Sequence, residues 1–340
     1  MRVFVTGGTG FVGSALIRAL RARGEEVAAL RRSTSRVDRL ADLSVRWVEA
    51  PLTDAEALAR AMKGTEVVFH AAADLSYSRR DRPRQFETNV LGTRAVVGAS
   101  LRARVRRLVH TSSVAAVGIS ADGRPLDETA PYNARPLDIG YFETKRAAEE
   151  EVARAVGEGL DAVLVSPSVV LGPGAGPRNS STLVLAVAGR RIPFVPPGGV
   201  NCIGIDDVVS GHLLALERGR RGERYILGSE NLSYPALFER IARIAGVAPP
   251  RRRIPGRLVR SFVQVLRSLD RLGVVGRSLR PEALATLGSR LFFDSSKARR
   301  ELGWRPAPID EAVRATVEEL RRQGLLPAKK GEPLPNPAGR

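Results

Sequence analysis

The chain has 340 residues, 43% of them hydrophobic and 26% charged, which is the composition of a globular protein with a sizeable core. The single cysteine, Cys202, excludes an internal disulfide framework, and the absence of a run of about 18 apolar residues excludes a membrane-spanning helix. The net charge of +18 comes mainly from arginine, but only 5% of residues are aromatic and none interleave with basic residues to stack bases, so nucleic acid is not an expected partner.

Apolar runs alternate with amphipathic stretches through the first half of the chain. The runs lack polar alternation, which is typical of parallel strands covered by helices on both faces. The expected strands are Arg2–Thr6, Glu26–Leu30, Val45–Glu49, Val67–Ala71, Arg107–Ser112 and Ala162–Ser166. The expected helices are Val12–Arg23, Asp54–Met62, Phe86–Arg102 and Tyr141–Val156. This alternation predicts an α/β fold with a doubly wound parallel sheet.

The regular alternation ends after Pro167. The expected helices that follow are Thr182–Gly189, Asp206–Arg218, Tyr234–Gly246 and Arg257–Leu272, and the expected strands are Arg224–Leu227 and Leu291–Phe293. Short mixed elements with Pro and Gly loops predict a smaller α/β lobe. We expect a main domain over residues 1–167, to which segments such as 200–216 return, a substrate lobe over 168–325, and a disordered tail over 326–340.

A glycine-rich turn joins the first strand to the first helix. Gly7 permits a tight turn with a positive φ, Gly10 lets the backbone approach a pyrophosphate, and Gly13 allows close packing of the helix. The N-terminus of the helix adds free N–H groups and a positive dipole. The pattern predicts a dinucleotide site formed by Gly7, Thr9, Gly10, Phe11, Val12 and Gly13.

The end of the second strand favours NADP over NAD. A carboxylate at this place would bind the ribose 2′-hydroxyl of NAD and repel a 2′-phosphate. The sequence has Arg31 and Arg32 instead, followed by the hydroxyls of Ser33 and Thr34, with no acidic residue until Asp38. Two guanidiniums suit a 2′-phosphate. The alternative is that one arginine stacks on adenine or faces water.

A tyrosine and a lysine, Tyr141 and Lys145, have the i,i+4 spacing that puts both side chains on one helix face. At about 4 Å and an effective dielectric near 20, their attraction would be on the order of 4 kcal/mol, or up to roughly three pKa units. We therefore expect the pKa of Tyr141 to fall toward neutrality, where proton transfer is most efficient. The fifth strand ends in Ser112 and Ser113 at the edge where ligands bind, and we assign the substrate contact to Ser113.

Together these motifs resemble the extended short-chain dehydrogenases/reductases, which have a Rossmann fold. The resemblance covers about residues 1–323 and is also carried by His70–Ala73, Asn89–Thr93, Leu291–Lys297 and Leu302–Pro306. It implies that Tyr141 is the acid/base and that Lys145 lowers its pKa and holds the nicotinamide ribose. It also implies that Ser113 bonds the substrate oxygen and that Asn89 supports the active-site helix and a proton relay. The further implied cofactor contacts are Leu52, Ala71, Ala72, Ala73, Pro167 and Ser168.

Within this family the chain is most similar to dihydroflavonol-reductase-like and 3β-hydroxysteroid-dehydrogenase-like enzymes. The hopanoid-associated sugar epimerase group is similar again, in Asp206–Glu217 and Gly222–Gly228. One departure concerns adenine: family members commonly read Gly-Asp-Leu after the third strand, where this chain has Ala50-Pro51-Leu52. Asp54 is a candidate to replace the missing carboxylate. A second departure is Ile203-Gly204-Ile205, where the family reads like Val-His-Val.

The second lobe indicates an apolar substrate. Nucleotide-sugar epimerases of this family typically have an Arg and an Asn just after the sixth strand, and Val165–Pro173 has neither. The segment Arg257–Leu272 has apolar residues at helical spacing, flanked by arginines, and predicts either a helix packed on the core or one lying on an anionic membrane surface. The apolar positions are Leu258, Val259, Phe262, Val265, Leu266 and Leu269, and the flanking ones are Arg260, Arg267 and Arg271.

The sequence therefore predicts an NAD(P)-dependent oxidoreductase that transfers hydride between nicotinamide and a carbonyl or hydroxyl carbon of an apolar small molecule. One alternative is a sugar epimerase or dehydratase with retained cofactor, and another is a non-catalytic cofactor-binding or membrane-associated regulatory protein. We expect a cytoplasmic homodimer, with a peripheral membrane location as an alternative. No metal site is expected, because His70, His110 and His212 lack carboxylate and cysteine neighbours.

Overall fold

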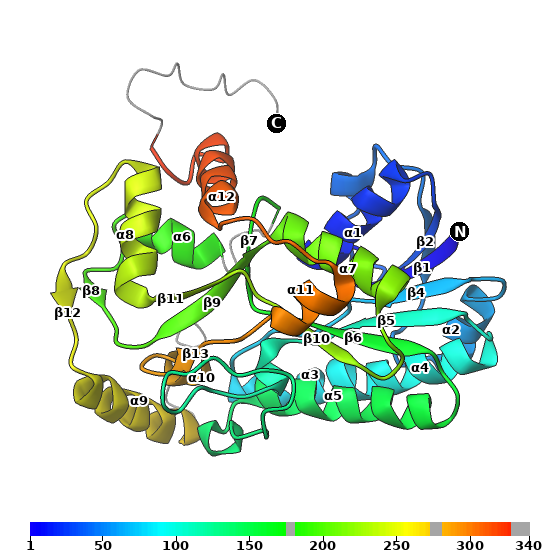
Figure 1. The fold of residues 1–340 in the computed structure, drawn as a ribbon, viewed down its shortest axis with the longest axis horizontal. Coiled ribbons are helices and arrows are strands. Elements are labelled where there is room, and N and C mark those ends of the chain that lie inside the picture. Colours follow the sequence, from blue (N-terminus) through cyan, green and yellow to red (C-terminus); the bar gives the residue numbers. More distant parts are fainter. Residues whose placement is uncertain (175–180, 273–280, 328–340) are drawn as a thin grey trace.

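The computed structural model describes residues 1–174, 181–272 and 281–327. Its main element is a seven-stranded sheet with the strand order β10-β6-β5-β4-β1-β2-β3 (Figure 1). Every neighbouring pair in this sheet is parallel, so the predicted doubly wound α/β fold is confirmed. The strands are β1 (Arg2–Thr6), β2 (Glu26–Arg31), β3 (Arg46–Glu49), β4 (Val67–His70), β5 (Arg107–Thr111), β6 (Ala162–Pro167) and β10 (Arg224–Leu227).

Helices cover both faces of this sheet (Figure 1). Successive side chains of a strand point to opposite faces, so Val3 and Val5 of β1 pack toward one layer of helices and Phe4 toward the other. The first layer holds α1 (Phe11–Ala22), α7 (Ile205–Arg218) and α11 (Ser296–Leu302), and the second holds α2 (Ala55–Ala61), α4 (Gly92–Arg102) and α5 (Gly140–Gly157). Burial on both faces explains why the strands are continuously apolar.

A second lobe is built around a smaller sheet (Figure 1). Its strands are β7 (Val169–Leu171), β9 (Gly199–Gly204), β11 (Glu230–Ser233) and β13 (Arg290–Leu291), and its core helices are α6 (Ser181–Ala188), α8 (Tyr234–Ala245) and α12 (Asp310–Arg322). The short strands β8 (Phe194–Val195) and β12 (Arg252–Arg253) pair in parallel. At the margin of the lobe lie α9 (Gly256–Arg271) and α10 (Pro281–Ala285).

The chain crosses between the two lobes more than once after β6. The segment that forms α7 returns to the main domain and packs against α1, whereas residues 200–204 of the predicted returning segment belong to β9 of the second lobe. Residues 224–227 return as well, because Tyr225, Ile226 and Leu227 are fully buried and pair with β6. At the other end of the lobe, Leu326 is buried in the second core, although the predicted tail begins there. Most of that tail, residues 328–340, lies outside the described residues, and the domain boundaries remain a prediction.

The helix expected over Phe86–Arg102 is not a single α-helix. It begins as α3 (Arg82–Phe86), passes through a π-helical turn over Glu87–Leu91, and continues as α4. Asn89 lies in this wide turn, and its side chain is hydrogen-bonded to both the N–H and the carbonyl of Asp74. Such turns are frequent at functional sites, and periodicity alone does not reveal them.

All three histidines of the chain are buried beside the main sheet. His70 and His110 are register partners on β4 and β5, with ring centroids 5.1 Å apart. His212 of α7 is 2.8 Å from the hydroxyl of Thr111 through Nε2. Burial lowers the pKa of His70 to about 3 and of His212 to about 4, and it lowers the pKa of His110 well below its usual value. The three imidazoles are therefore neutral at physiological pH.

These buried imidazoles predict a loss of stability in mild acid. The unfolded chain takes up protons near pH 6.5 that the folded chain cannot accept, so the free energy of unfolding should fall as pH drops below 6.5. Each histidine contributes at most about 1.4 kcal/mol per pH unit. Unfolding midpoints between pH 7.5 and 5, in steps of about half a unit, measure the slope.

The control is His110→Leu, since no described residue lies within hydrogen-bond distance of either ring nitrogen of His110. In this variant, the slope of the unfolding free energy against pH should be about a third smaller than in the wild-type protein. A wild-type midpoint that stays constant over this range would contradict the assignment.

Candidate active site

The glycine-rich turn after β1 packs backbone against backbone. Gly7 has φ +70°, and a Cβ added to it would lie 2.6 Å from the carbonyl carbon of Ala71 and from the nitrogen of Ala72. A Cβ on Gly13 would lie 2.2 Å from the carbonyl oxygen of Gly7. The turn is closed by a 2.9 Å hydrogen bond from the Gly10 N–H to that same oxygen. The structure thus brings the glycines together with Ala71 and Ala72, and no larger residue fits at Gly7 or Gly13.

The residues present fit a bound dinucleotide. The first turn of α1 has no acidic residue and no side-chain cap, so the N–H groups that follow Gly10 remain available to a pyrophosphate. At the end of β6, Pro167 and Ser168 are buried, and the Ser168 hydroxyl has no hydrogen-bond partner among the described residues. A buried hydroxyl of this kind is costly unless a ligand or water satisfies it.

At the expected adenine end of the site, Asp54 caps α2. Its Oδ1 accepts the N–H of Ala57 at 2.9 Å, and its role toward adenine stays a prediction. Leu52 packs closely against α4, since a Cβ on Gly92 would lie 2.6 Å from its Cδ2. Ala73 is half-buried and follows Ala71 and Ala72 in the segment after β4.

Arg31 has a neighbour that the local sequence does not show. Its Nη2 lies 3.3 Å from Oε2 of Glu49, which is its register partner on β3. Arg32 is exposed, and its N–H donates to the Ser35 hydroxyl at 3.1 Å. One of the two predicted guanidiniums is thus paired with a carboxylate and the other is open to solvent.

Tyr141 and Ser113 meet at the carboxyl edge of the main sheet. Tyr141, in the first turn of α5, is 7% exposed, and its hydroxyl lies close enough to the side chain of Ser113, which follows β5, for that side chain to lower its pKa. Ser112 points elsewhere and donates to Oε1 of the buried Glu149 at 2.6 Å. The two serines thus have different partners, and the substrate contact of Ser113 stays a prediction.

The expected direction of the pKa shift of Tyr141 is wrong for this structure. Burial raises the pKa of Tyr141 above its usual value, and the side chain of Ser113 opposes that effect. Burying a phenolate removes its hydration, and this loss outweighs the stabilisation of the anion. Tyr141 is therefore protonated at neutral pH.

Lys145 lies one turn further along α5 and is 2% exposed. Its Nζ donates to the carbonyl oxygen of Thr111 at 2.8 Å, which fixes the ammonium beneath the end of β5. Burial lowers the pKa of Lys145 to about 8, while the charge of Glu149 raises it. The lysine is thus charged at neutral pH but close to its titration range.

Asn89 connects the loop after β4 to α5. Its Nδ2 donates to the Thr144 hydroxyl at 3.0 Å and to the carbonyl of Asp74, also at 3.0 Å. Its Oδ1 accepts the N–H of Asp74 at 2.7 Å. The side chain is fully used in joining these two segments, and this is the geometry expected of a residue that supports the active-site helix.

A buried chain of hydrogen bonds links Asn89 to the glycine-rich turn. The Thr93 hydroxyl donates to the carbonyl of Asn89 at 2.6 Å, so it can only accept from Nε2 of His70, 2.9 Å away. Nδ1 of His70 must then accept from the Thr6 hydroxyl at 2.7 Å. The geometry assigns the Nε2–H tautomer to His70, and the sequence analysis did not identify this link.

Two further residues at the site were missed as site residues. The ring of Tyr77 packs on the ring of Tyr141 with centroids 5.6 Å apart. Glu282 of α10 is buried and accepts the N–H of Gly140, the residue before Tyr141, at 3.1 Å. The position of Tyr77 after the fourth strand was a usable signal, whereas no local pattern connects Glu282 to a residue 142 positions away.

Comparison with known proteins agrees with this geometry. Residues 3–228 match the NAD dependent epimerase/dehydratase family. The sterol demethylase protein B of Methylococcus capsulatus is 34% identical over 331 residues, which are 96% of this chain and 100% of that protein. A 3-beta-hydroxysteroid dehydrogenase of Mycolicibacterium neoaurum is 31% identical over 98% of this chain and 96% of that protein.

The crystal structure of a nucleoside-diphosphate-sugar epimerase from Pseudomonas aeruginosa superposes with a TM-score of 0.80 at 27% identity, and the match covers 96% of this chain and 99% of that one. This epimerase thus shares its fold with the chain over nearly the whole length of both. The chain belongs to the NAD dependent epimerase/dehydratase family, and its expected place among the extended short-chain dehydrogenases/reductases is confirmed.

Proposed function

We propose that the protein catalyses hydride transfer between NAD(P) and a carbonyl or hydroxyl carbon of an apolar small molecule, with Tyr141 moving the proton. The observation that carries this proposal is that the buried Tyr141 lies beside the side chain of Ser113 at the carboxyl edge of β5, one helical turn before the buried Lys145. Two hydroxyls that meet there can both bond one substrate oxygen. Ligands bind at this edge in open α/β sheets.

The protonation states suit the reductive direction. The raised pKa of Tyr141 keeps a proton on the phenol, ready for donation to a carbonyl oxygen held by Ser113. Lys145, fixed on the Thr111 carbonyl, places a positive charge beside the site and a donor for a ribose hydroxyl. NAD(P)H, when bound, supplies the hydride. Asn89 holds α5 and the loop after β4 in place during proton transfer.

The surroundings of Tyr141 support an apolar substrate. The side chains packed around it are Tyr77, Ala115, Ile119, Tyr132, Ala134, Leu137, Ile139, Phe142 and Ala285. No arginine or asparagine follows β6 to bind a diphosphate, because the segment there is Ser168–Pro173. Two of the relatives, a sterol demethylase protein and a 3-beta-hydroxysteroid dehydrogenase, support a polycyclic alcohol or ketone as the substrate class.

The loss of one phenol oxygen should stop turnover. Tyr141→Phe removes the proton donor and should lower kcat by about two to four orders of magnitude, while the Kd for NADPH changes little. Tyr132→Phe is the matched control, because its hydroxyl bonds only Glu143 in the described structure, at 2.7 Å. Kinetics with a panel of ketones and a fluorescence titration of NADPH measure both quantities. Full activity in Tyr141→Phe would refute this mechanism.

The pH dependence should follow Lys145 and not Tyr141. A pKa of about 8 means that Lys145 loses its charge above pH 8, so kcat/KM for ketone reduction should fall there. Tyr141, whose pKa is raised above its usual value, keeps its proton through the same range. A profile between pH 6 and about 9.5 locates the decline. A profile without any decline above pH 8 would show that the charge of Lys145 is not required.

We also propose that NADP is preferred over NAD, on the basis of Arg31 and Arg32. The carboxylate of Glu49 beside Arg31 competes with a 2′-phosphate for the same guanidinium. Glu49→Gln should therefore raise the affinity for NADPH severalfold and leave that for NADH nearly unchanged. The double variant Arg31→Ala with Arg32→Ala should weaken NADPH binding far more than NADH binding. Equal losses for the two cofactors in titrations would overturn the assignment.

The alternatives remain separable by product analysis. A reductase oxidises NADPH with net consumption, an epimerase converts its substrate with no net change in the cofactor, and a regulatory protein binds NADPH without turnover. The cytoplasmic location and the homodimer stay predictions. The described helices include none long and apolar enough to cross a membrane.

A further inference from the structure

The helix α9 has two apolar stripes, only one of which is used by the fold. Val259, Val263 and Leu266 are 7–8% exposed and attach the helix to the lobe. Their spacing of four and three residues is that of a helix face packed on a core. Of the six apolar positions that the sequence predicts on this helix, only Val259 and Leu266 are buried in the protein.

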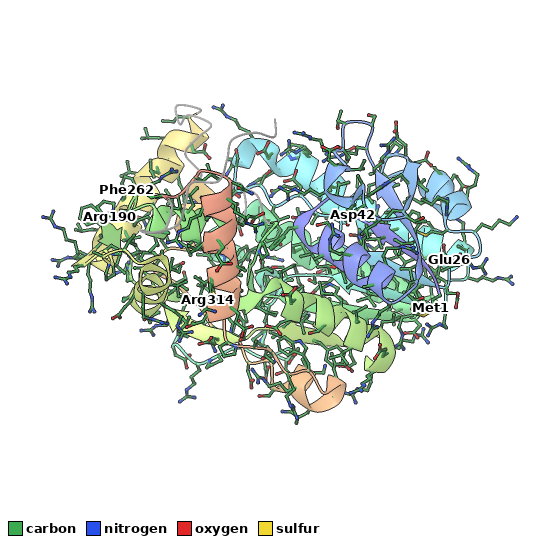
Figure 2. The ribbon with its side chains drawn as sticks, turned by 90° about the horizontal axis from the view of Figure 1, so that it is seen from above. Met1, Glu26, Asp42, Arg190, Phe262 and Arg314 are labelled. Carbon is green, nitrogen blue, oxygen red and sulfur yellow. The ribbon has the colours of Figure 1, made fainter. Side chains whose placement is uncertain are left out.

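The second stripe faces solvent along the whole helix. Its members and exposed fractions are Leu258 (56%), Phe262 (57%), Val265 (58%), Leu269 (39%) and, just after the helix, Leu272 (75%). At 3.6 residues per turn these five side chains fall within a sector about 80° wide. Figure 2 places Phe262 at the rim of the second lobe. Contiguous exposed apolar side chains of this kind mark an interaction surface.

The segment that carries this stripe is strongly basic. Residues 251–272 contain seven arginines and one acidic residue, Asp270. Arg257 and Arg260 of α9 are exposed, as are the arginines 251–253 that precede it; Arg257 lies on the flank of the stripe and Arg260 on the opposite side of the helix. A helix with an exposed apolar stripe and exposed arginines on its polar side matches an anionic lipid surface, because acyl chains take up the apolar side chains and headgroups attract the arginines. A second copy of the chain fits poorly, because apposed α9 helices would bring like charges together.

The same helix adjoins the start of α5. Arg267 of α9 donates to the carbonyl of Asp138 at 3.0 Å and to that of Leu137, three and four residues before Tyr141. The neighbouring α10 contributes Glu282, whose carboxylate accepts the N–H of Gly140. A surface that docks on α9 would therefore lie next to the segment that leads into the active-site helix.

We infer that the stripe formed by Leu258, Phe262, Val265, Leu269 and Leu272, with its arginines, docks the protein on the surface of an anionic lipid bilayer. The helix lies in the plane of the headgroups and does not cross the membrane. The docked lobe presents the active site to apolar molecules dissolved in the bilayer. This last part rests on the proposed reductase function, whereas the docking itself does not.

Co-sedimentation of the full chain with vesicles tests the docking directly. Wild-type protein should bind vesicles of phosphatidylcholine with phosphatidylglycerol, should bind phosphatidylcholine alone much more weakly, and should be released by high salt. The double variant Phe262→Ser with Leu269→Ser should bind at least about tenfold more weakly, because apolar burial in the interface is lost. Arg257→Glu with Arg260→Glu should also abolish binding to the anionic vesicles.

The matched control is Leu325→Ser, a residue after α12 that is 38% exposed, against 39% for Leu269. It should leave binding unchanged, and equal unfolding midpoints for all variants should confirm that each is folded. Absence of wild-type binding to anionic vesicles, or equal binding of the stripe variant, would overturn the inference. The inference would also be overturned if the wild-type protein did not bind lipid and the stripe variant lost self-association instead.

The activity measurement separates this inference from the proposed function. The stripe variant should reduce a water-soluble ketone at the wild-type rate and a vesicle-borne apolar ketone at least about tenfold more slowly. Lipid binding without reduction of either ketone would overturn the reductase proposal and leave the docking intact. If a variant that no longer binds vesicles still reduced both ketones at wild-type rates, that result would overturn only the claim that docking delivers apolar substrates from the bilayer to the active site.

Discussion

The position of α5 on the main sheet is the constraint on which the active site depends. The helix is held at successive points: Gly140 by Glu282, Thr144 by Asn89, and Lys145 by the carbonyl of Thr111. These partners come from α10, the π-helical turn and β5, which are far apart in the sequence. Only with the helix fixed in this way does the Tyr141 hydroxyl meet Ser113 at the sheet edge.

The burial that fixes these side chains also sets their charges. Taking a phenol out of water favours its neutral form, and taking an ammonium out of water favours the free amine. The pKa values of Tyr141 and Lys145 therefore shift in opposite directions, upward for the phenol and downward for the ammonium, so that Lys145 loses its proton at a lower pH than Tyr141. Sequence spacing revealed the proximity of the two groups but not their hydration, which is why the sign of the shift at Tyr141 could not be predicted.

Short-range features of the fold could likewise be predicted from the sequence, whereas long-range contacts could not. Local patterns were sufficient for the strands of the parallel sheet and for the glycine-rich turn, because periodicity and strand ends are short-range signals. Long-range partners were not accessible: Glu49 beside Arg31 depends on strand register, and Glu282 on the path of the second lobe. The π-helical turn at Asn89 depends on side-chain bonds that no periodicity records.

The buried chain from Thr6 through His70 and Thr93 to Asn89 has a direction. Each hydroxyl or imidazole gives its proton toward Asn89, whose carbonyl can only accept, so every dipole in the row is aligned head to tail. Aligned donors polarise one another, and none can reverse unless all do. The segment before the glycine-rich turn and the main-chain carbonyl of Asn89 are therefore the two ends of one oriented row of hydrogen bonds. Replacing His70 would interrupt this row of hydrogen bonds on both of its sides, toward Thr6 and toward Thr93, although His70 itself need touch neither cofactor nor substrate.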